Sequence, residues 1–394
     1  MLVLPESARA ELGRRPFGMY VHVPFCASRC GYCDFNTYTA GDLGGARLQS
    51  GYADAALDEV RLAARELSAD GAGLPRVETV FFGGGTPTLL PPDELVRILA
   101  GIDAAFGLVP GAEVTVEANP DSVDRAGLDA LRAGGFTRIS FGMQSASSRV
   151  LAVLERSHRP GRPEQAAGDA RAAGFTHVNL DLIFGTPGET DGEWRRTLDA
   201  ALDAGPDHIA AYALTVEPRT RLAAQVRAGR VAAPDDTVQA RRYALADALL
   251  EAAGFSWYEL SNWARGPAAR CRHNLLYWRN DHWWGVGPGA HSHIAGTRWW
   301  NIAHPSAYAE AVAADRLPCV GSETLTTEQR ALEDLMLGVR LVEGLALDHL
   351  DPATVAALCA DGLLDRAALG AGRAVLSAAG RPLADHVARV LATA

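Results

Sequence analysis

The chain has 394 residues, of which 48% are hydrophobic and 21% charged, as expected of a globular protein with a large core and a second, smaller domain. Its 47 acidic residues outnumber its 37 basic ones, and the formal net charge of −10 argues against nucleic acid as a partner. The N-terminal sequence MLVLPE has no basic segment followed by an apolar run. No apolar stretch reaches the ~18 residues that a membrane span needs, so we expect a cytoplasmic protein without a membrane span.

Short β-branched or aromatic runs alternate with longer amphipathic stretches from residue 18 to about residue 215, the pattern of βα units around a parallel sheet. Helices are expected between the strands, for example at 52–67, 92–106 and 194–202. Six such units make about three quarters of a (βα)8 barrel, so the expected fold is α/β, an incomplete (βα)6 TIM-like barrel. The predicted strands lie at 18–23, 77–82, 113–117, 137–142, 177–183 and 208–214.

The pattern changes after residue 218. A helix predicted at 238–251 precedes an aromatic, glycine-rich stretch, 255–300, that contains seven of the eight tryptophans and indicates a packing surface or a surface for a flat ligand. From about residue 326 the chain is rich in Leu, Ala and charged residues, typical of a small, mostly helical domain whose last helix is predicted at 382–392. We therefore divide the chain into a barrel, an aromatic connecting region and a helical C-terminal domain, at residues 1–230, 231–320 and 321–394.

The six cysteines are too few for a disulfide scaffold, and three of them, Cys26, Cys30 and Cys33, lie within eight residues after the first predicted strand. This clustering indicates metal chemistry in a reducing compartment. Three thiolates on a four-iron cluster leave one iron open to chelate S-adenosylmethionine (SAM) and to pass one electron to its sulfonium. A structural zinc and chance clustering are the alternatives, although zinc sites usually have a fourth protein ligand.

The CxxxCxxC motif, followed by a glycine-rich turn after the second strand, resembles the radical SAM superfamily. Within it, residues 20–35, GGGTPT at 83–88, EANP at 117–120 and FGMQS at 141–145 resemble the group of coproporphyrinogen III dehydrogenases and HemW heme chaperones. The resemblance covers nearly the whole chain. It implies that Cys26, Cys30 and Cys33 hold a [4Fe–4S] cluster and that SAM binds beside it.

The resemblance also implies a SAM site at the carboxyl ends of successive strands, the face where barrel sites are built. Glycines there let the backbone approach a ligand, and a carboxylate accepts hydrogen bonds from ribose hydroxyls. Each of these residues alone also has a plain structural interpretation, such as a tight turn, a core position or a solvated surface. His22, on the same strand face as Tyr20, either points toward the cluster or fills the core. The implied SAM residues are Tyr20, Gly84, Gly85, Thr86, Glu117, Gln144, Arg156 and Asp181.

The segment CRHNLLYW at 271–278 matches the HNxxYW pattern of HemW-type proteins. Imidazole is a good axial ligand for heme iron, and Tyr and Trp offer flat apolar faces to a porphyrin. The implied heme residues are therefore His273, Tyr277 and Trp278. A hydrogen-bonded packing role for His273, or closure of the barrel by this segment, is the alternative. His282, His291 and His293 are reserve ligands, and no CxxCH motif for covalent heme attachment is present.

The function implied by the resemblance is that of a heme chaperone, which binds the cluster, SAM and heme and passes heme to acceptor hemoproteins. No residue is assigned a catalytic role. Respiratory enzymes are candidate acceptors, reached by transient membrane contact, and the formation of a homodimer is left open. The alternative is an oxygen-independent coproporphyrinogen III dehydrogenase, which is disfavoured because family dehydrogenases resemble CxxxCxxCxC and Phe35 stands at the last position here. A radical enzyme acting on RNA or on another small molecule is disfavoured by the negative charge.

Overall fold

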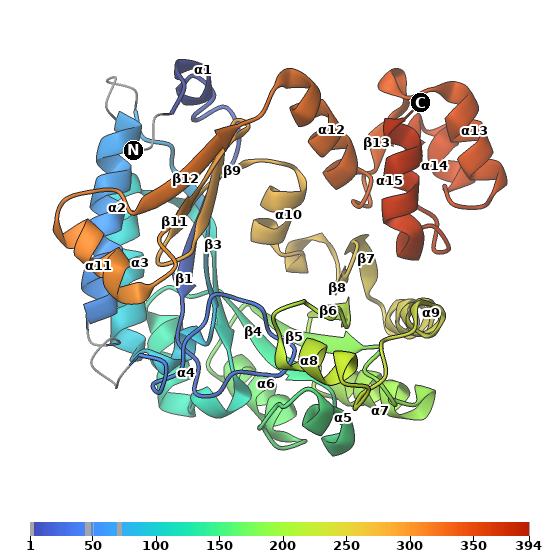
Figure 1. The fold of residues 1–394 in the computed structure, drawn as a ribbon, viewed down its shortest axis with the longest axis horizontal. Coiled ribbons are helices and arrows are strands. Elements are labelled where there is room, and N and C mark those ends of the chain that lie inside the picture. Colours follow the sequence, from blue (N-terminus) through green and yellow to red (C-terminus); the bar gives the residue numbers. More distant parts are fainter. Residues whose placement is uncertain (1–3, 44–48, 50, 69–72, 394) are drawn as a thin grey trace.

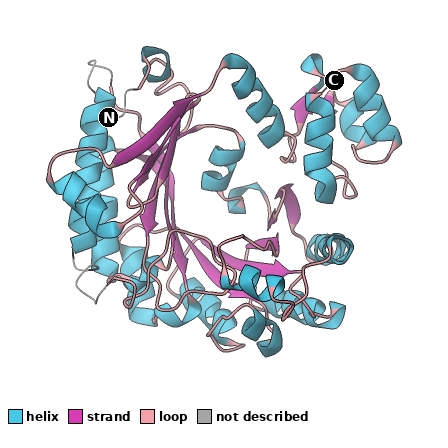
Figure 2. Ribbon diagram, viewed as in Figure 1, coloured by secondary structure: helices cyan, strands magenta, loops and turns pink. Residues whose placement is uncertain are grey.

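The computed structural model describes residues 4–43, 49, 51–68 and 73–393. The first three residues of the N-terminal segment considered above lie outside this part. The described residues include no helix that is long and apolar enough to cross a membrane. They fold around one curved sheet of twelve strands, with most helices on its convex side and the C-terminal helices beside its open, concave side (Figure 2).

The parallel strands β1 to β6 pair in chain order, which confirms the predicted βα repeat. The sheet does not close into a barrel, because it continues beyond β6 into β8 and β7, and beyond β1 into β9, β10, β11 and β12. The fold is thus an incomplete barrel with extended edges. The bounds are β1 (Phe17–Val23), β2 (Val77–Gly84), β3 (Leu108–Ala118), β4 (Arg138–Gln144), β5 (His177–Phe184), β6 (His208–Ala213), β7 (Ser256–Glu259), β8 (Asn262–Ala264), β9 (His282–Val286), β10 (His291–Ile294), β11 (Thr297–Asn301) and β12 (Cys319–Thr324).

Alternation along β1 decides which side chains face the helices. Met19, Val21 and Val23 are buried in the main hydrophobic cluster together with apolar side chains of the outer helices. Tyr20 and His22, between them, face the concave side, where the Tyr20 ring lies 6.3 Å from that of Phe81 in β2. The concave side is therefore the one that carries polar and aromatic groups.

Most helices that connect the strands of the barrel cover the convex side (Figure 1). Their starts follow local signals: α7, for example, begins with a capping box in which Thr190 and Glu193 each bond the other's backbone N–H. The helices are α1 (Glu6–Arg9), α2 (Tyr52–Ser68), α3 (Pro92–Phe106), α4 (Arg125–Ala133), α5 (Ser148–Val153), α6 (Arg162–Ala172), α7 (Asp191–Asp203), α8 (Arg221–Arg227), α9 (Asp236–Ala252), α10 (Arg272–Trp278), α11 (Pro305–Ala313), α12 (Thr327–Gly338), α13 (Pro352–Ala360), α14 (Arg366–Gly370) and α15 (Ala384–Ala392).

The aromatic stretch 255–300 forms β7 to β11 and α10, and several of its tryptophans are core residues. Trp284 and Trp299, for example, are both buried, with ring centroids 4.9 Å apart. The strands β9 to β11 extend the barrel sheet from the free edge of β1, so this stretch shares one sheet with the strands that precede residue 230. Helix α10 lies on the concave side of this sheet (Figure 1).

The C-terminal part is mostly helical, as expected. It contains α12 to α15 and the two short strands β13 (Leu345–Ala346) and β14 (Arg373–Ala374). Its own hydrophobic cluster is built from buried side chains between Val339 and Leu391. Figure 1 shows this part, in red, at the end of the chain and to one side of the sheet. The division into parts at residues 230 and 320 stays a prediction.

Candidate functional site

Tyr20, Glu117 and Asp181 come from three different strands and face the concave side near the carboxyl ends of those strands. Burial, and after it the negative charge of Asp181, raises the pKa of Glu117 to about 8. The pKa of Asp181 is also raised by burial, although its carboxylate accepts hydrogen bonds from Ser140 Oγ at 2.7 Å and Asn179 Nδ2 at 2.8 Å. Two carboxyl groups held close together in a buried site favour a ligand that donates hydrogen bonds, as ribose hydroxyls do.

The glycine turn at the end of β2 packs closely against the cysteine loop. Gly84 has a φ of +107°, and a side chain at Gly85 would begin 2.5 Å from the backbone oxygen of Phe25. The backbone N–H of Gly85 donates to Val23 O at 2.8 Å, and that of Thr86 donates to Phe25 O at 2.7 Å. Backbone hydrogen bonds therefore hold the turn against the loop.

The cysteine loop brings half-buried thiols to the mouth of the barrel. The Oγ1 of Thr86 lies 4.0 Å from Cys26 Sγ. Burial raises the pKa of the Cys26 thiol, and it raises that of Cys33 to about 11. Because iron binds the thiolate, loading a cluster here must release protons.

The donor set of the loop, three free thiols, fits an iron–sulfur cluster in its chemistry. No group of three or more His, Cys, Asp and Glu side chains within the described residues is placed to hold a single metal ion. A four-iron cluster has a different requirement, because each cysteine binds its own iron and the three sulfurs stand farther apart than ligands of one ion. Cys26, Cys30 and Cys33 would hold three irons, and the fourth would supply the open position for SAM.

Arg156 connects the cysteine loop to β4. Its guanidinium donates to Cys30 Sγ at 3.6 Å and to the backbone oxygen of Gly142 at 2.9 Å. Gln144 adopts a φ of +63°, a conformation that costs energy for a residue other than glycine and often occurs at binding sites. A side chain on Gly142 would begin 2.6 Å from Arg156 Nη2 and 2.9 Å from Gln144 Nε2, so the two predicted SAM residues lie together.

His22 links Tyr20, on the predicted SAM face, to the chain that follows the cysteine loop through two hydrogen bonds. Its Nε2 lies 2.9 Å from the backbone oxygen of Asn36, so this nitrogen carries the proton, and its Nδ1 then accepts from Tyr20 OH at 2.9 Å. Asn36 in turn donates to Pro288 O at 3.0 Å. His22 therefore orients Tyr20 and holds the chain that follows Cys33.

The structure places His273 inside the barrel, where only 1% of it is exposed. Its Nδ1 is hydrogen-bonded to Thr79 Oγ1 at 2.7 Å and its Nε2 to Tyr277 OH at 2.8 Å. The ring stacks on Phe81 at 5.2 Å, and burial lowers its pKa to about 3. Neither nitrogen is open to iron in this conformation, so a heme-ligand role would require Tyr277 or Thr79 to move away. These contacts are those of the hydrogen-bonded packing alternative, and the heme-ligand role of His273 stays a prediction.

Glu113 anchors α10 in that position, which the sequence reasoning missed. Its carboxylate accepts from the backbone N–H groups of Arg272 at 3.1 Å and His273 at 3.0 Å. Tyr277 is half-buried, and its ring meets that of Trp283 edge-on at 4.7 Å. Trp278 packs at the border of a small cluster around Tyr258. The sequence offered one signal for the role of Glu113, namely that a charged residue begins the strand predicted at 113–117.

Tyr212 was also missed. It is one of the last residues of β6. Partial burial, and after it the negative charge of the nearby Asp181, raises the pKa of its hydroxyl group. The side chain thus stands at the rim of the concave site, opposite the cysteine loop in strand order. Its position near the carboxyl end of a strand was the available signal.

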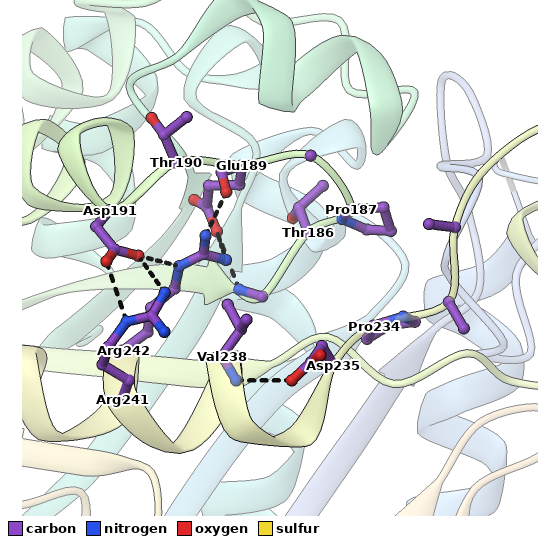
Figure 3. A pocket seen from close by; sticks show the side chains of 14 residues that line it. Thr186, Pro187, Glu189, Thr190, Asp191, Pro234, Asp235, Val238, Arg241 and Arg242 are labelled. Carbon is purple, nitrogen blue, oxygen red and sulfur yellow. Dashed lines mark hydrogen bonds and ion pairs between the residues drawn. The ribbon is translucent and has the colours of Figure 1, made fainter.

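A separate pocket of about 390 Å³ lies between the loop at 185–191 and the start of α9 (Figure 3). Four of its charged groups form ion pairs: Arg242 with Glu189 at 2.9 Å, and Arg241 with Asp191 at 3.0 Å. The carboxylate of Asp235 instead accepts from the backbone N–H of Val238 at 2.9 Å. Burial raises the pKa of Glu189 to about 7 despite Arg242. The pocket contains none of the residues predicted to bind the cluster, SAM or heme.

Comparisons with known proteins identify the family of the chain. Residues 20–201 match the model of the Radical SAM superfamily. The fold and the site therefore define a radical SAM protein, a class that binds a [4Fe–4S] cluster and SAM. The chain is 52% identical to the Heme chaperone HemW of Mycobacterium tuberculosis, over 97% of this chain and 96% of that protein. It is 33% identical to the Heme chaperone HemW of Bacillus subtilis, over 88% of this chain and 92% of that protein. The chain thus belongs to the HemW family.

The fold is also that of a solved structure, coproporphyrinogen III oxidase (HemN) from Escherichia coli. The TM-score is 0.81, and the match covers 98% of this chain and 92% of that one. Because only 23% of the residues are identical, this likeness concerns the fold alone.

Proposed function

We propose that the protein is a cytoplasmic heme chaperone, which binds heme and passes it to acceptor hemoproteins. The observation that carries this proposal is the 52% identity, over 97% of the chain, to a protein named Heme chaperone HemW. In this proposal SAM and the [4Fe–4S] cluster occupy the concave site, and SAM acts as a bound regulator that is not consumed on a porphyrin. The acceptors are respiratory hemoproteins, which the chaperone meets by transient contact at the membrane.

Coproporphyrinogen III dehydrogenase is the second candidate, because the solved structure of such an oxidase shares the fold. Phe35 argues against this activity, because the family dehydrogenases have a further cysteine at this position. The Phe35 side chain is 60% exposed, so packing does not demand phenylalanine here and would tolerate cysteine. The absence of a cysteine at position 35 is therefore not explained by core packing.

The test uses the full chain, reconstituted with iron and sulfide without oxygen. Hemin is titrated into it and followed by Soret absorbance, and a parallel sample receives coproporphyrinogen III, SAM and a reductant. We expect saturable one-to-one hemin binding and no decarboxylated porphyrinogen. Decarboxylated product would establish the dehydrogenase instead, and hemin binding without saturation would contradict the chaperone.

A further inference from the structure

A heme carrier needs an iron ligand that heme can reach, and the eleven histidines differ in this respect. All of them lie within the described residues. Four have both ring nitrogens hydrogen-bonded, namely His22, His208, His273 and His293. His158 and His282 are buried, and His177 is paired with Asp207. The exposed histidines are His291, His304, His349 and His386.

His291 differs from the other exposed histidines in its surroundings. It begins β10 and faces the concave side, where its ring stacks on Trp300 of β11 at 5.9 Å with an angle of 24° between the planes. Among the described residues, neither of its ring nitrogens has a hydrogen-bond partner. His304 instead precedes α11 and meets the Tyr38 ring edge-on, with centroids 5.9 Å apart, and His349 and His386 belong to the C-terminal helical part.

The strands around His291 hold it firmly. Trp283 Nε1 in β9 donates to the backbone oxygen of His291 at 3.0 Å, and Ser292 Oγ accepts from Gly285 N at 2.8 Å. Gly321 in β12 lies opposite Trp300, and a side chain there would begin 2.4 Å from the indole ring. The glycine thus lets the indole lie flat on the strand. An imidazole supported by a stacked indole on paired strands has a preset orientation, as a metal ligand needs.

This surface is continuous with the predicted SAM site. Gly285 in β9 pairs with Tyr20 in β1, and β10 follows β9 in the sheet, so His291 lies two strands beyond the row of SAM residues. Packed aromatic rings support these strands: the centroids of Tyr277 and Trp283 are 4.7 Å apart, and those of Trp283 and the buried His293 are 4.9 Å apart. A flat ligand held at His291 would therefore lie on the same concave face as SAM.

We propose that the heme cargo binds on the concave face of β9 to β11, with a ring nitrogen of His291 as an iron ligand and with Trp300 orienting that ring. The proposal rests on the proposed function and replaces His273 by a histidine that heme can reach. Burial, and then Arg298, lowers the pKa of His291, so the neutral imidazole that binds iron is present at neutral pH.

The test compares His291→Ala with the control His304→Ala, which removes another exposed imidazole. Each reconstituted variant is titrated with hemin and, separately, with iron-free protoporphyrin IX. We expect the hemin affinity of His291→Ala to fall more than about tenfold, a loss typical of disturbed metal sites, and that of His304→Ala to stay at the wild-type value. Protoporphyrin IX should bind His291→Ala as it binds the wild type, because it has no iron to ligate. Iron content reports whether each variant is folded.

The possible results distinguish a failure of the ligand assignment from a failure of the proposed function. If the wild type binds hemin and His291→Ala binds it equally well, the ligand assignment is overturned and the chaperone stands. If His291→Ala loses both porphyrins while it keeps its cluster, iron ligation by His291 is overturned as well. If the wild type itself shows no saturable hemin binding, the proposed function fails, and this site fails with it.

Discussion

The backbone N–H of Gly84 donates a hydrogen bond to the carboxyl group of Glu117, with 3.1 Å between nitrogen and Oε2. This bond joins the glycine turn after β2 to the end of β3, two elements predicted to hold SAM. Burial and the nearby Asp181 raise the pKa of Glu117 to about 8, so the carboxyl group is mostly protonated at neutral pH before a ligand binds. The pH dependence of SAM binding should therefore show when Glu117 becomes charged.

Above about pH 8, where the carboxylate has formed, Glu117→Gln should lower the affinity for SAM on the order of tenfold, because a carboxylate accepts hydrogen bonds from ribose hydroxyls more strongly than an amide does. In the wild type the affinity should rise as the pH passes upward through about 8, since the carboxylate forms in that range. Gln does not titrate, so the rise should be smaller in the variant. Calorimetric titration of reconstituted protein measures both effects. Glu94→Gln, on the surface of α3, is the control, and equal SAM binding by Glu117→Gln would sink the assignment.

Cys30→Ser should lose bound iron and the broad visible absorbance of the cluster, because a serine hydroxyl is a poor iron ligand in a site built for thiolates. Iron and sulfide analysis after reconstitution is the measurement. Cys319→Ser is the matched control, because Cys319 is a half-buried cysteine in β12, outside the loop. A Cys30→Ser protein that retains the full cluster would remove Cys30 from the ligand set.

His273→Phe should destabilise the protein by about 2 kcal/mol, since it leaves Thr79 Oγ1 and Tyr277 OH without their partner inside the barrel. Phenylalanine keeps the stacking on Phe81, so the variant should still fold and still bind hemin. Urea unfolding gives the loss of stability, and a Soret titration gives the affinity. Full stability together with lost hemin binding would restore His273 as the heme ligand.

Glu59 predicts a pH dependence of stability. It is fully buried on α2 and accepts hydrogen bonds from Gly287 N, Tyr308 OH and Asn301 Nδ2, each at 2.7 Å, yet burial raises its pKa to about 7. A folded-state pKa above the unfolded value means that the folded protein binds the extra proton, so this group's contribution to stability is lost as the pH rises toward 7 and beyond. The contribution is fully present only below the unfolded pKa of about 4.5.

Glu59→Gln removes the titrating group and keeps its size. As the pH rises from about 5.5 to about 8, the free energy of unfolding of the wild type should therefore fall by about 2 kcal/mol relative to that of the variant. This value follows from the ~1.4 kcal/mol that corresponds to each unit between the starting pH and the folded-state pKa. Urea unfolding across this range measures the difference. A constant difference between the two proteins would show that Glu59 does not titrate there.

The sequence by itself determined the features that depend on neighbouring residues. The run from Phe17 to Val23 and its counterparts predicted the parallel strands, and the spacing of Cys26, Cys30 and Cys33 predicted a cluster loop after the first of them. Strand and helix patterns are local, since they follow from side chains two to four residues apart. The positions of Tyr20, Glu117 and Asp181 on one face follow from the same alternation once the strands are parallel.

Only the tertiary structure decided which side chains a ligand can reach. The sequence made His273 the implied heme ligand and His291 a reserve ligand. In the structure His273 is bonded to Thr79, 194 residues away, whereas His291 is exposed beside Trp300. Likewise, no local pattern indicated that β9 pairs with β1, or that Glu113 holds α10 inside the barrel. Exposure and hydrogen-bond partners depend on contacts between distant segments, so they emerge only when the sheet has curved and α10 has filled it.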